Sequence, residues 1–274
     1  MIGRVTVVLL ILGALVAAAF LFGNISYIPS GNSLSAVGSQ KELLHLTADV
    51  WGLFDPQTGE ILAGSNTDSQ KPIASVTKLF TAYAAMQSSS TLNTEFRILW
   101  RDLNVEGEAG RLSYGELMTN RRLLFPLLIV SSNDAGAAIR RTLGPDFSES
   151  QTALIKNLGL ESTVIVDGTG LSPDNRSTVR DLARFYAYLR EAQPYIVDIT
   201  QLNMYIAKNN GWINNNPART LESYRGGKHG FITEAKTTFV GSFMVGEKET
   251  GVVLLGSSDL LADIRQLIEY AKSI

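Results

Sequence analysis

Ser75 and Lys78 are the first residues whose types and spacing could do chemistry. A serine hydroxyl is a weak nucleophile until a base takes its proton. The apolar periodicity of residues 75–87 predicts a helix, on which two residues three positions apart share one face. The apolar neighbours of the pair favour burial, which would lower the lysine pKa and make it a base. On its own, the pair also fits a helix start followed by a solvated lysine.

Ser131 and Asn133 form a second pair, in a segment between two predicted helices. In an extended loop, residues i and i+2 point the same way, so both side chains would face one site. There Ser131 could pass a proton between a lysine and a leaving group, and the Asn133 amide could hold a substrate carbonyl. The alternative is a helix N-cap, for which Ser, Asn and the following Asp134 are all suited.

A third group, Lys228-His229-Gly230, falls on a predicted strand. Lys228 could bind an anionic substrate group, and its charge would lower the pKa of a nearby Lys78. Gly230 would let a substrate backbone lie flat along the strand. Alone, the group is explained as a solvated strand lysine beside a small residue. Together, the three groups place Ser-x-x-Lys on a helix start, Ser-x-Asn in a loop and Lys-x-Gly on a strand, and this combination predicts one nucleophilic centre.

The elements that must position these groups follow from periodicity, caps and turns. A strand hairpin, a helical middle, a strand meander and a final helix predict an α/β (α+β) fold, in which one antiparallel sheet is flanked by helices and carries an inserted helical subdomain. The expected strands are 48–54, 60–64, 225–231, 237–245 and 251–256. The expected helices are 75–87, 115–130, 134–143 and 260–273, with Pro126 as a kink or end of the second. Two more helices are expected between the last two of these: one is opened by a capping box at 148–151 and closed by Gly159, and the other opens at Thr178.

Composition excludes several classes of protein. The chain of 274 residues carries 26 acidic and 24 basic residues, so its charge offers no reason to expect a nucleic-acid partner. It has no cysteine, which excludes disulfides, thiolate metal sites and cysteine nucleophiles. Its two histidines, His45 and His229, are too few for a multi-histidine metal site, and no metal or cofactor is expected.

The N-terminal residues predict a membrane anchor. Residues 5–23 carry no charge, and as a helix they would be about 28 Å long, close to the bilayer core of ~30 Å. Arg4 precedes this run, and a basic residue at that position favours a cytoplasmic location for residues 1–4 and export of the rest of the chain. A signal peptide that is cleaved is the competing interpretation, with a secreted product. Residues 24–45 then form a flexible linker, and residues 46–274 the catalytic domain.

Beyond the three groups, whole segments resemble the serine-type D-alanyl-D-alanine carboxypeptidases, the low-molecular-mass penicillin-binding proteins. The resemblance covers about residue 47 to the C-terminus and implies a β-lactamase/DD-peptidase-like fold. It is carried by residues 73–79, 128–135, 158–160, 167–173 and 177–183.

The resemblance implies a mechanism. Ser75 would attack the carbonyl between two D-alanines of a peptidoglycan stem peptide, with Lys78 as the general base. Ser131 would pass the proton to the departing D-alanine, and Asn133 would hold the peptide. Backbone N–H groups of Ser75 and Phe231 would form the oxyanion hole. β-Lactam antibiotics would acylate the serine as covalent inhibitors, and water would release the natural acyl-enzyme.

The third group departs from the family pattern. Lys228 is expected among the catalytic residues, but His229 replaces the usual threonine that helps bind the substrate's terminal carboxylate. A ring N–H could serve instead, more strongly if protonated. Residues 256–260 also lack the arginine that often binds this carboxylate. With Gly230 and Phe231, His229 is therefore expected to bind substrate, and carboxypeptidase or endopeptidase specificity stays open.

Two other functions remain. A degenerate, non-catalytic module that binds wall peptides is suggested by the change at His229, whereas the intact serines and lysines argue against it. A β-lactamase would need a further base for fast deacylation, and no convincing glutamate lies between Gly168 and Tyr224.

Overall fold

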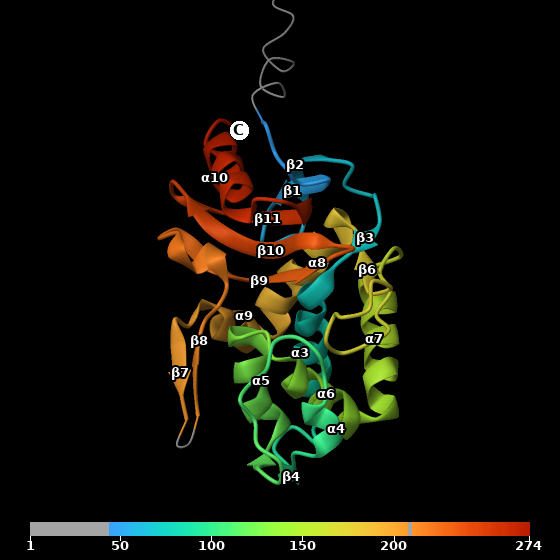
Figure 1. Ribbon diagram of the computed structural model, residues 1–274. Helices are drawn as coiled ribbons and strands as arrows, with labels where there is room; N and C mark the ends of the chain where they lie inside the picture. Colours follow the sequence, from blue (N-terminus) through green and yellow to red (C-terminus); the bar gives the residue numbers. More distant parts are fainter. Residues whose placement is uncertain (1–43, 208–209) are drawn as a thin grey trace, which may run out of the picture. The chain divides into compact units, whose positions relative to one another are not determined.

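The central sheet is antiparallel and has five strands in the order β2-β1-β11-β10-β9 (Figure 1). The computed structural model describes residues 44–207 and 210–274. Because β1 pairs with β11, the N-terminal hairpin and the C-terminal meander join in one sheet, which confirms the expected topology. The strands are β1 Val50–Phe54, β2 Ile61–Ser65, β9 Tyr224–Ile232, β10 Lys236–Val245 and β11 Lys248–Ser257.

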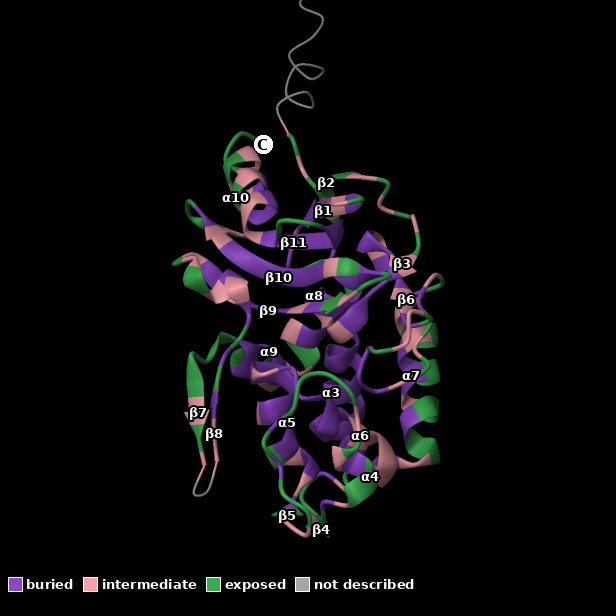
Figure 2. Cartoon of the chain, in the orientation of Figure 1, coloured by how far each residue is buried: buried purple, intermediate pink, exposed green. Residues whose placement is uncertain are grey.

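Helices cover both faces of this sheet (Figures 1 and 2). Successive residues of a strand point to opposite faces, and β11 shows the result. Val252 and Leu254 pack in the cluster that contains α10 (Leu260–Ala271), whereas Val253 and Leu255 pack in the larger core with α8 (Val179–Ala192). The long run of buried residues on β11 is therefore the signature of a strand covered on both sides.

The helical middle surrounds one central helix, α3 (Thr77–Gln87). Every residue from Thr77 to Ala85 is buried, because α5, α6 and α7 pack around it. Lys78 lies in the first turn of this helix, and its side chain is fully buried. The other elements of the middle are β3 Lys71–Pro72, η1 Ala74–Val76, β4 Phe96–Arg97, α4 Trp100–Leu103, β5 Leu117–Met118, α5 Asn120–Ile129, α6 Asn133–Leu143, α7 Pro145–Leu158, β6 Arg176–Ser177, α9 Pro194–Gln201, β7 Met204–Ile206, β8 Gly211–Ile213 and η2 Pro217–Thr220.

Two expected helix starts are wrong. The helix expected from residue 115 begins at Asn120, because β5 pairs with β4 just before it and the Thr119 hydroxyl accepts the N–H of Arg122 as a cap. The helix expected to open at 148–151 begins at Pro145, whose fixed φ suits the first helical position. Gly159 closes that helix in the left-handed conformation, as predicted.

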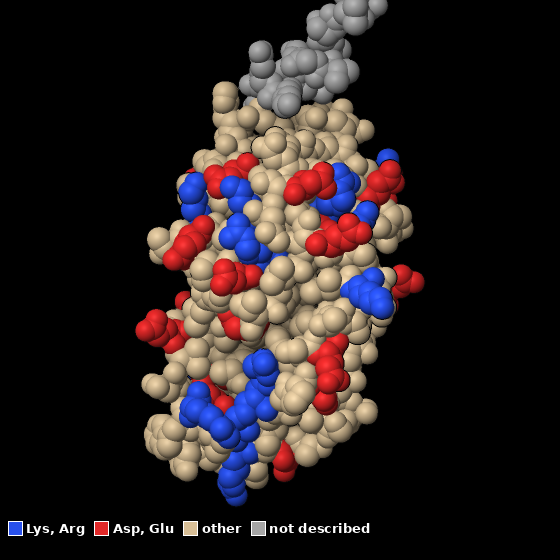
Figure 3. Space-filling view, turned by 90° about the vertical axis from the view of Figure 1, so that its right-hand side faces the viewer, with Lys and Arg blue, Asp and Glu red and all other residues tan. Residues whose placement is uncertain are grey.

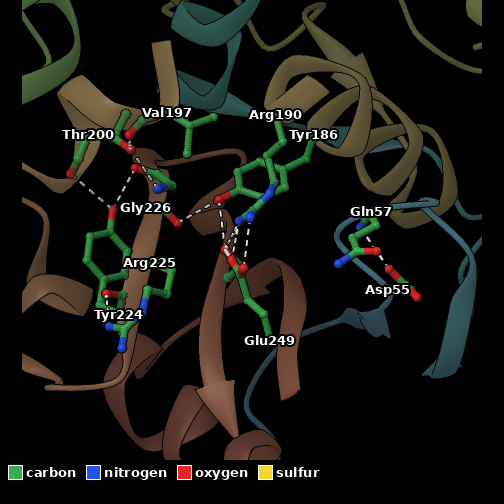
Figure 4. Close-up of polar contacts among 12 residues, drawn as sticks. Asp55, Gln57, Tyr186, Arg190, Val197, Thr200, Tyr224, Arg225, Gly226 and Glu249 are labelled. Atoms are coloured by element: carbon green, nitrogen blue, oxygen red, sulfur yellow. Dashed lines mark hydrogen bonds and ion pairs between the residues drawn. The ribbon is translucent and has the colours of Figure 1, made fainter. Parts of the chain in front are cut away.

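A polar network joins α8 to the three C-terminal strands (Figure 4). The Tyr186 hydroxyl donates to the Gly226 carbonyl at 3.0 Å and lies 3.0 Å from the Ser242 hydroxyl. Arg190 binds both carboxylate oxygens of Glu249, and its Nη2–Oε2 contact measures 2.7 Å. These bonds fix β9, β10 and β11 against α8. The strand β9 carries Lys228, His229 and Gly230, so the same bonds help to position these residues.

Among residues 44–207 and 210–274, no helix combines the length and the apolarity needed to cross a bilayer. The expected anchor at 5–23 lies outside the described residues, as do residues 1–4 and nearly all of the expected linker. From His45 onward the chain is tied to α10, since Gln266 bonds the His45 backbone and Asp263 accepts the Thr47 N–H at 2.8 Å.

Candidate active site

Two glycines let backbone segments approach Ser75 from both sides. Ser75 lies in the short helix η1, directly before α3. A Cβ atom on Gly230 of β9 would stand 2.3 Å from the Ser75 nitrogen, and one on Gly170 would stand 2.0 Å from the Ala74 carbonyl oxygen. Gly170 also has a φ of +85°, which favours glycine. The nucleophile is therefore held between β9 and the loop that contains Gly170.

The Lys78 amine has three oxygen neighbours. Its Nζ atom lies 2.8 Å from Ser75 Oγ, 2.7 Å from Asn133 Oδ1 and 2.5 Å from the Thr169 carbonyl oxygen. The amide oxygen and the carbonyl can only accept hydrogen bonds, so they take two N–H groups. A neutral amine then has only its lone pair left, and that lone pair faces the Ser75 hydroxyl. This is the geometry of a base poised to take the serine proton.

Burial makes the neutral form of Lys78 accessible. Desolvation is the largest cause that lowers its pKa well below the usual value, and the positive charge of Lys228 lowers it further. The carboxylates of Asp167, Glu108 and Asp134 oppose this shift without cancelling it. Both effects expected from the sequence, burial and the Lys228 charge, are thus present.

Ser131 and Asn133 face the two lysines separately. Asn133 Nδ2 donates to the Glu106 carbonyl at 2.7 Å, which turns its Oδ1 atom toward Lys78. Ser131 Oγ accepts from Lys228 Nζ at 2.9 Å. The expected extended loop is wrong: Ser131 has a φ of +59°, and Asn133 is already the first residue of α6. The N-cap role falls to Ser132, whose hydroxyl accepts the Ala135 N–H at 2.9 Å.

Lys228 is a second fully buried amine in the same site. It donates to Ser131 Oγ and, at 2.8 Å, to the His229 carbonyl oxygen. Burial lowers the pKa of Lys228 to about 7, against the opposing charge of Glu108. The alternative of a solvated strand lysine is therefore excluded, and Lys228 lies close enough to Lys78 for its charge to lower the Lys78 pKa.

The His229 ring carries no charge at neutral pH. Burial, with the charges of Lys228 and Lys78, lowers the pKa of His229 to about 3. Its Nδ1 atom is buried and has no hydrogen-bond partner among the described residues. At neutral pH the ring can offer a hydrogen bond but no charge. Phe231, two residues on, is 67 % exposed.

The loop 167–173 holds Lys78 through the Thr169 carbonyl, a role that sequence reasoning did not give it although the loop is part of the resemblance. Asp167 accepts the backbone N–H groups of Thr169, Gly170 and Ser172 at 2.6–2.9 Å. Burial raises the pKa of Asp167, but these backbone bonds outweigh it and lower the pKa overall. The bonds fix the Thr169 carbonyl that accepts from Lys78. The Asp-Gly-Thr-Gly sequence is the available signal, because aspartate and glycine favour such turns.

The arrangement places a serine hydroxyl beside a buried lysine whose pKa is lowered, a pairing suited to acyl transfer with lysine in the place that histidine takes in other serine enzymes. Among residues 44–207 and 210–274, no group of three or more His, Asp or Glu side chains is arranged to hold a metal ion. The chain belongs to the D-alanyl-D-alanine carboxypeptidase family, whose sequence model matches residues 36–259.

Relatives and a solved structure agree with this family. A D-alanyl-D-alanine endopeptidase of Pseudomonas aeruginosa is 33 % identical over 141 residues, covering 50 % of this chain and 46 % of the relative. The D-alanyl-D-alanine carboxypeptidase DacB2 of Mycobacterium tuberculosis is 28 % identical over 76 % of this chain and 74 % of its own. A crystal structure of a D-alanyl-D-alanine carboxypeptidase from the same organism matches with a TM-score of 0.75 and 25 % identity, over 83 % of this chain and 92 % of that one. These matches confirm the expected fold, although the match to the first of them spans less than half of that relative's length.

Proposed function

We propose that this protein is a serine-type D-alanyl-D-alanine carboxypeptidase that acts on peptidoglycan stem peptides through an acyl-enzyme at Ser75. The observation that carries the proposal is the Lys78 amine, which is fully buried and lies 2.8 Å from Ser75 Oγ. Family membership supplies the substrate class.

In the first step, Ser75 Oγ forms a bond to the carbonyl carbon of the penultimate D-alanine, and its proton passes to Lys78 Nζ. The oxyanion that develops lies at the backbone N–H groups of Ser75 and Phe231. Such donors stabilise charge that appears only in the transition state. The close approach of β9 to Ser75, which Gly230 permits, supports this pairing of N–H groups.

In the second step, the bond to the departing D-alanine breaks, and its nitrogen takes a proton from Ser131 Oγ. Lys78 resupplies Ser131 with the proton that it took from Ser75 and becomes neutral again, while Lys228, which donates to the Ser131 hydroxyl, keeps its charge. Asn133 holds the peptide and also orients Lys78. Water then attacks the ester on Ser75, with Lys78 again as the base, and the free serine returns. β-Lactams enter the first step as substrate mimics and leave slowly, as covalent inhibitors.

The proposed place of action is outside the cytoplasmic membrane, where peptidoglycan lies. The uncharged run at residues 5–23, preceded by Arg4, supports attachment by a single N-terminal span. Cleavage of that segment would give a secreted form with the same site.

The test is covalent labelling of the full-length protein with a fluorescent penicillin. We expect a labelled band that Ser75→Ala abolishes and that Ser89→Ala, a change at an exposed serine, leaves intact. Lys78→Ala should slow labelling by at least ~10²–10⁴-fold, the range for a lost general base. No band from folded wild-type protein would refute the proposal in favour of a non-catalytic wall-peptide module, and fast nitrocefin hydrolysis would favour a β-lactamase.

Endopeptidase activity on cross-linked peptides is a second candidate, favoured by the neutral state of His229. A cross-link made through a side-chain amine has no carboxylate beside the scissile bond, so a site without a positive charge at this position suits such a cross-link. Digestion of purified muropeptides separates the two activities. Loss of D-alanine from a pentapeptide monomer supports the carboxypeptidase, and splitting of a cross-linked dimer supports the endopeptidase.

A further inference from the structure

An arginine-lined cavity lies behind the loop that holds Lys78. The cavity measures about 320 Å³, and its charged lining consists of Arg101, Arg140 and Arg141 with Asp102 and Asp167. Figure 3 shows Lys and Arg side chains gathered on this face toward the end of the molecule that carries α4. The acylation chemistry described above uses none of these arginines.

Both carboxylates of the cavity are already satisfied. Asp102 accepts two hydrogen bonds from Arg141, from Nε and Nη2, each at 2.7 Å, and one from the Leu99 N–H. Asp167 is bonded to the backbone of its own loop and to Asn175 Nδ2 at 2.7 Å. Asp102 is thus paired with Arg141, whereas Asp167 is bonded to neutral donors and keeps its charge, so the three arginines and two carboxylates leave the lining with one excess positive charge.

Arg101 and Arg140 keep most of their donors available. A guanidinium carries five N–H groups. In the described part of the chain, Arg101 has no hydrogen-bond or ion-pair partner, and Arg140 has one, the Gly144 carbonyl at 2.9 Å. The Arg140 guanidinium also stacks over the Phe147 ring at 4.8 Å. Arg140 is thus fixed in place while still carrying unused donors and a full charge.

We propose that this cavity binds a phosphoryl group, either as free phosphate or as a phosphate ester. Guanidinium groups match the oxygens of phosphate in a bidentate way. A phosphoryl group offers at least as many acceptor oxygens as a carboxylate and up to twice its charge, so it suits a lining with two arginines that keep unused donors better. The far wall of the cavity is the segment 167–169, whose Thr169 carbonyl accepts from Lys78. A bound phosphoryl group would lie against the segment that positions the proposed base.

The test is calorimetric titration of the full-length protein with inorganic phosphate and with glycerol 3-phosphate, at constant ionic strength. We expect saturable binding with a Kd below about 10 mM. Arg101→Ala should weaken binding about 10-fold. Arg101→Lys keeps the charge but loses the bidentate guanidinium, so its Kd should lie between those of the wild type and Arg101→Ala. The matched control is Arg265→Ala, because Arg265 is an exposed arginine without an ion pair among the described residues.

Each outcome decides the matter. Weaker phosphate binding by Arg101→Ala, with binding by Arg265→Ala unchanged, supports the proposal. Whichever of glycerol 3-phosphate and inorganic phosphate then binds more tightly shows whether the cavity takes a phosphate ester or free phosphate. Absence of saturable binding overturns the proposal, as does equal weakening by Arg265→Ala or equal binding of acetate. Penicillin labelling of Arg101→Ala should match wild type, so failure of this proposal is distinguishable from failure of the proposed acylation.

Discussion

Replacing Gly230 by alanine tests how closely β9 must approach the nucleophile. The added methyl group would stand 2.3 Å from the Ser75 nitrogen, 2.9 Å from the Ser75 Cα atom and 3.0 Å from Ala74 Cβ. The two closest atoms belong to the backbone, so no flexible side chain can give way. Either β9 or the start of α3 must move.

The size of the movement sets the expected loss. Ordinary van der Waals contact begins at 3.4 Å, so relief of the 2.3 Å contact requires a displacement of roughly 1 Å. Because a misplacement of this size costs about 10²-fold in rate, we expect acylation by penicillin to slow about 100-fold. The free energy of unfolding should fall by only about 1–3 kcal/mol, as for an overpacked core.

The assay is the time course of fluorescent-penicillin labelling, together with thermal denaturation to show that the variant is folded. Gly211→Ala is the matched control, since Gly211 also lies in a strand but its added Cβ meets nothing closer than 3.8 Å. A folded Gly230→Ala protein that labels at nearly the wild-type rate would refute the argument that β9 is held against Ser75 by the absence of a side chain.

Three further predictions concern charge and orientation. Glu108→Gln removes a negative charge that raises the pKa of Lys78, so the acid limb of the acylation rate should move to lower pH; a pH profile that stays in place or moves upward would contradict this. His229→Thr should preserve or improve release of D-alanine, because a neutral ring adds no charge to carboxylate binding, and a large loss measured on a pentapeptide would mean that the imidazole recognises another group. Asp167→Asn should lower stability in chemical denaturation by about 2 kcal/mol, since an amide cannot accept all the bonds that fix Thr169; unchanged stability would argue against that role.

The sequence was sufficient to predict the residues that meet at Ser75. Ser75 and Lys78 are adjacent through helix periodicity alone, and burial of Lys78 followed from its apolar neighbours. The expected sheet and most of its strands were also predictable, because alternation and turn residues mark them locally. These features depend on short-range patterns, which one sequence contains in full.

Other features depend on long-range pairing or on the backbone, and these were not predictable. The late start of α5 arises because β5 pairs with β4, about twenty residues away. The Thr169 carbonyl, which orients Lys78, belongs to the main chain and gives no side-chain signal. The left-handed conformation of Ser131 breaks the period-two argument that paired it with Asn133, although both side chains still reach a lysine.

The division of charge between the two buried lysines follows from their partners. Two buried amines that are both charged would be costly, because each loses its hydration and each repels the other. Lys78 has the charge of Lys228 among the causes that lower its pKa, whereas burial alone lowers that of Lys228. Mutual repulsion therefore favours a state in which one amine is neutral, and the proposed mechanism assigns that state to Lys78, whose pKa is lowered well below its usual value. Before any substrate binds, one amine is then able to accept the Ser75 proton, while the other holds the Ser131 hydroxyl, through which that proton reaches the leaving group.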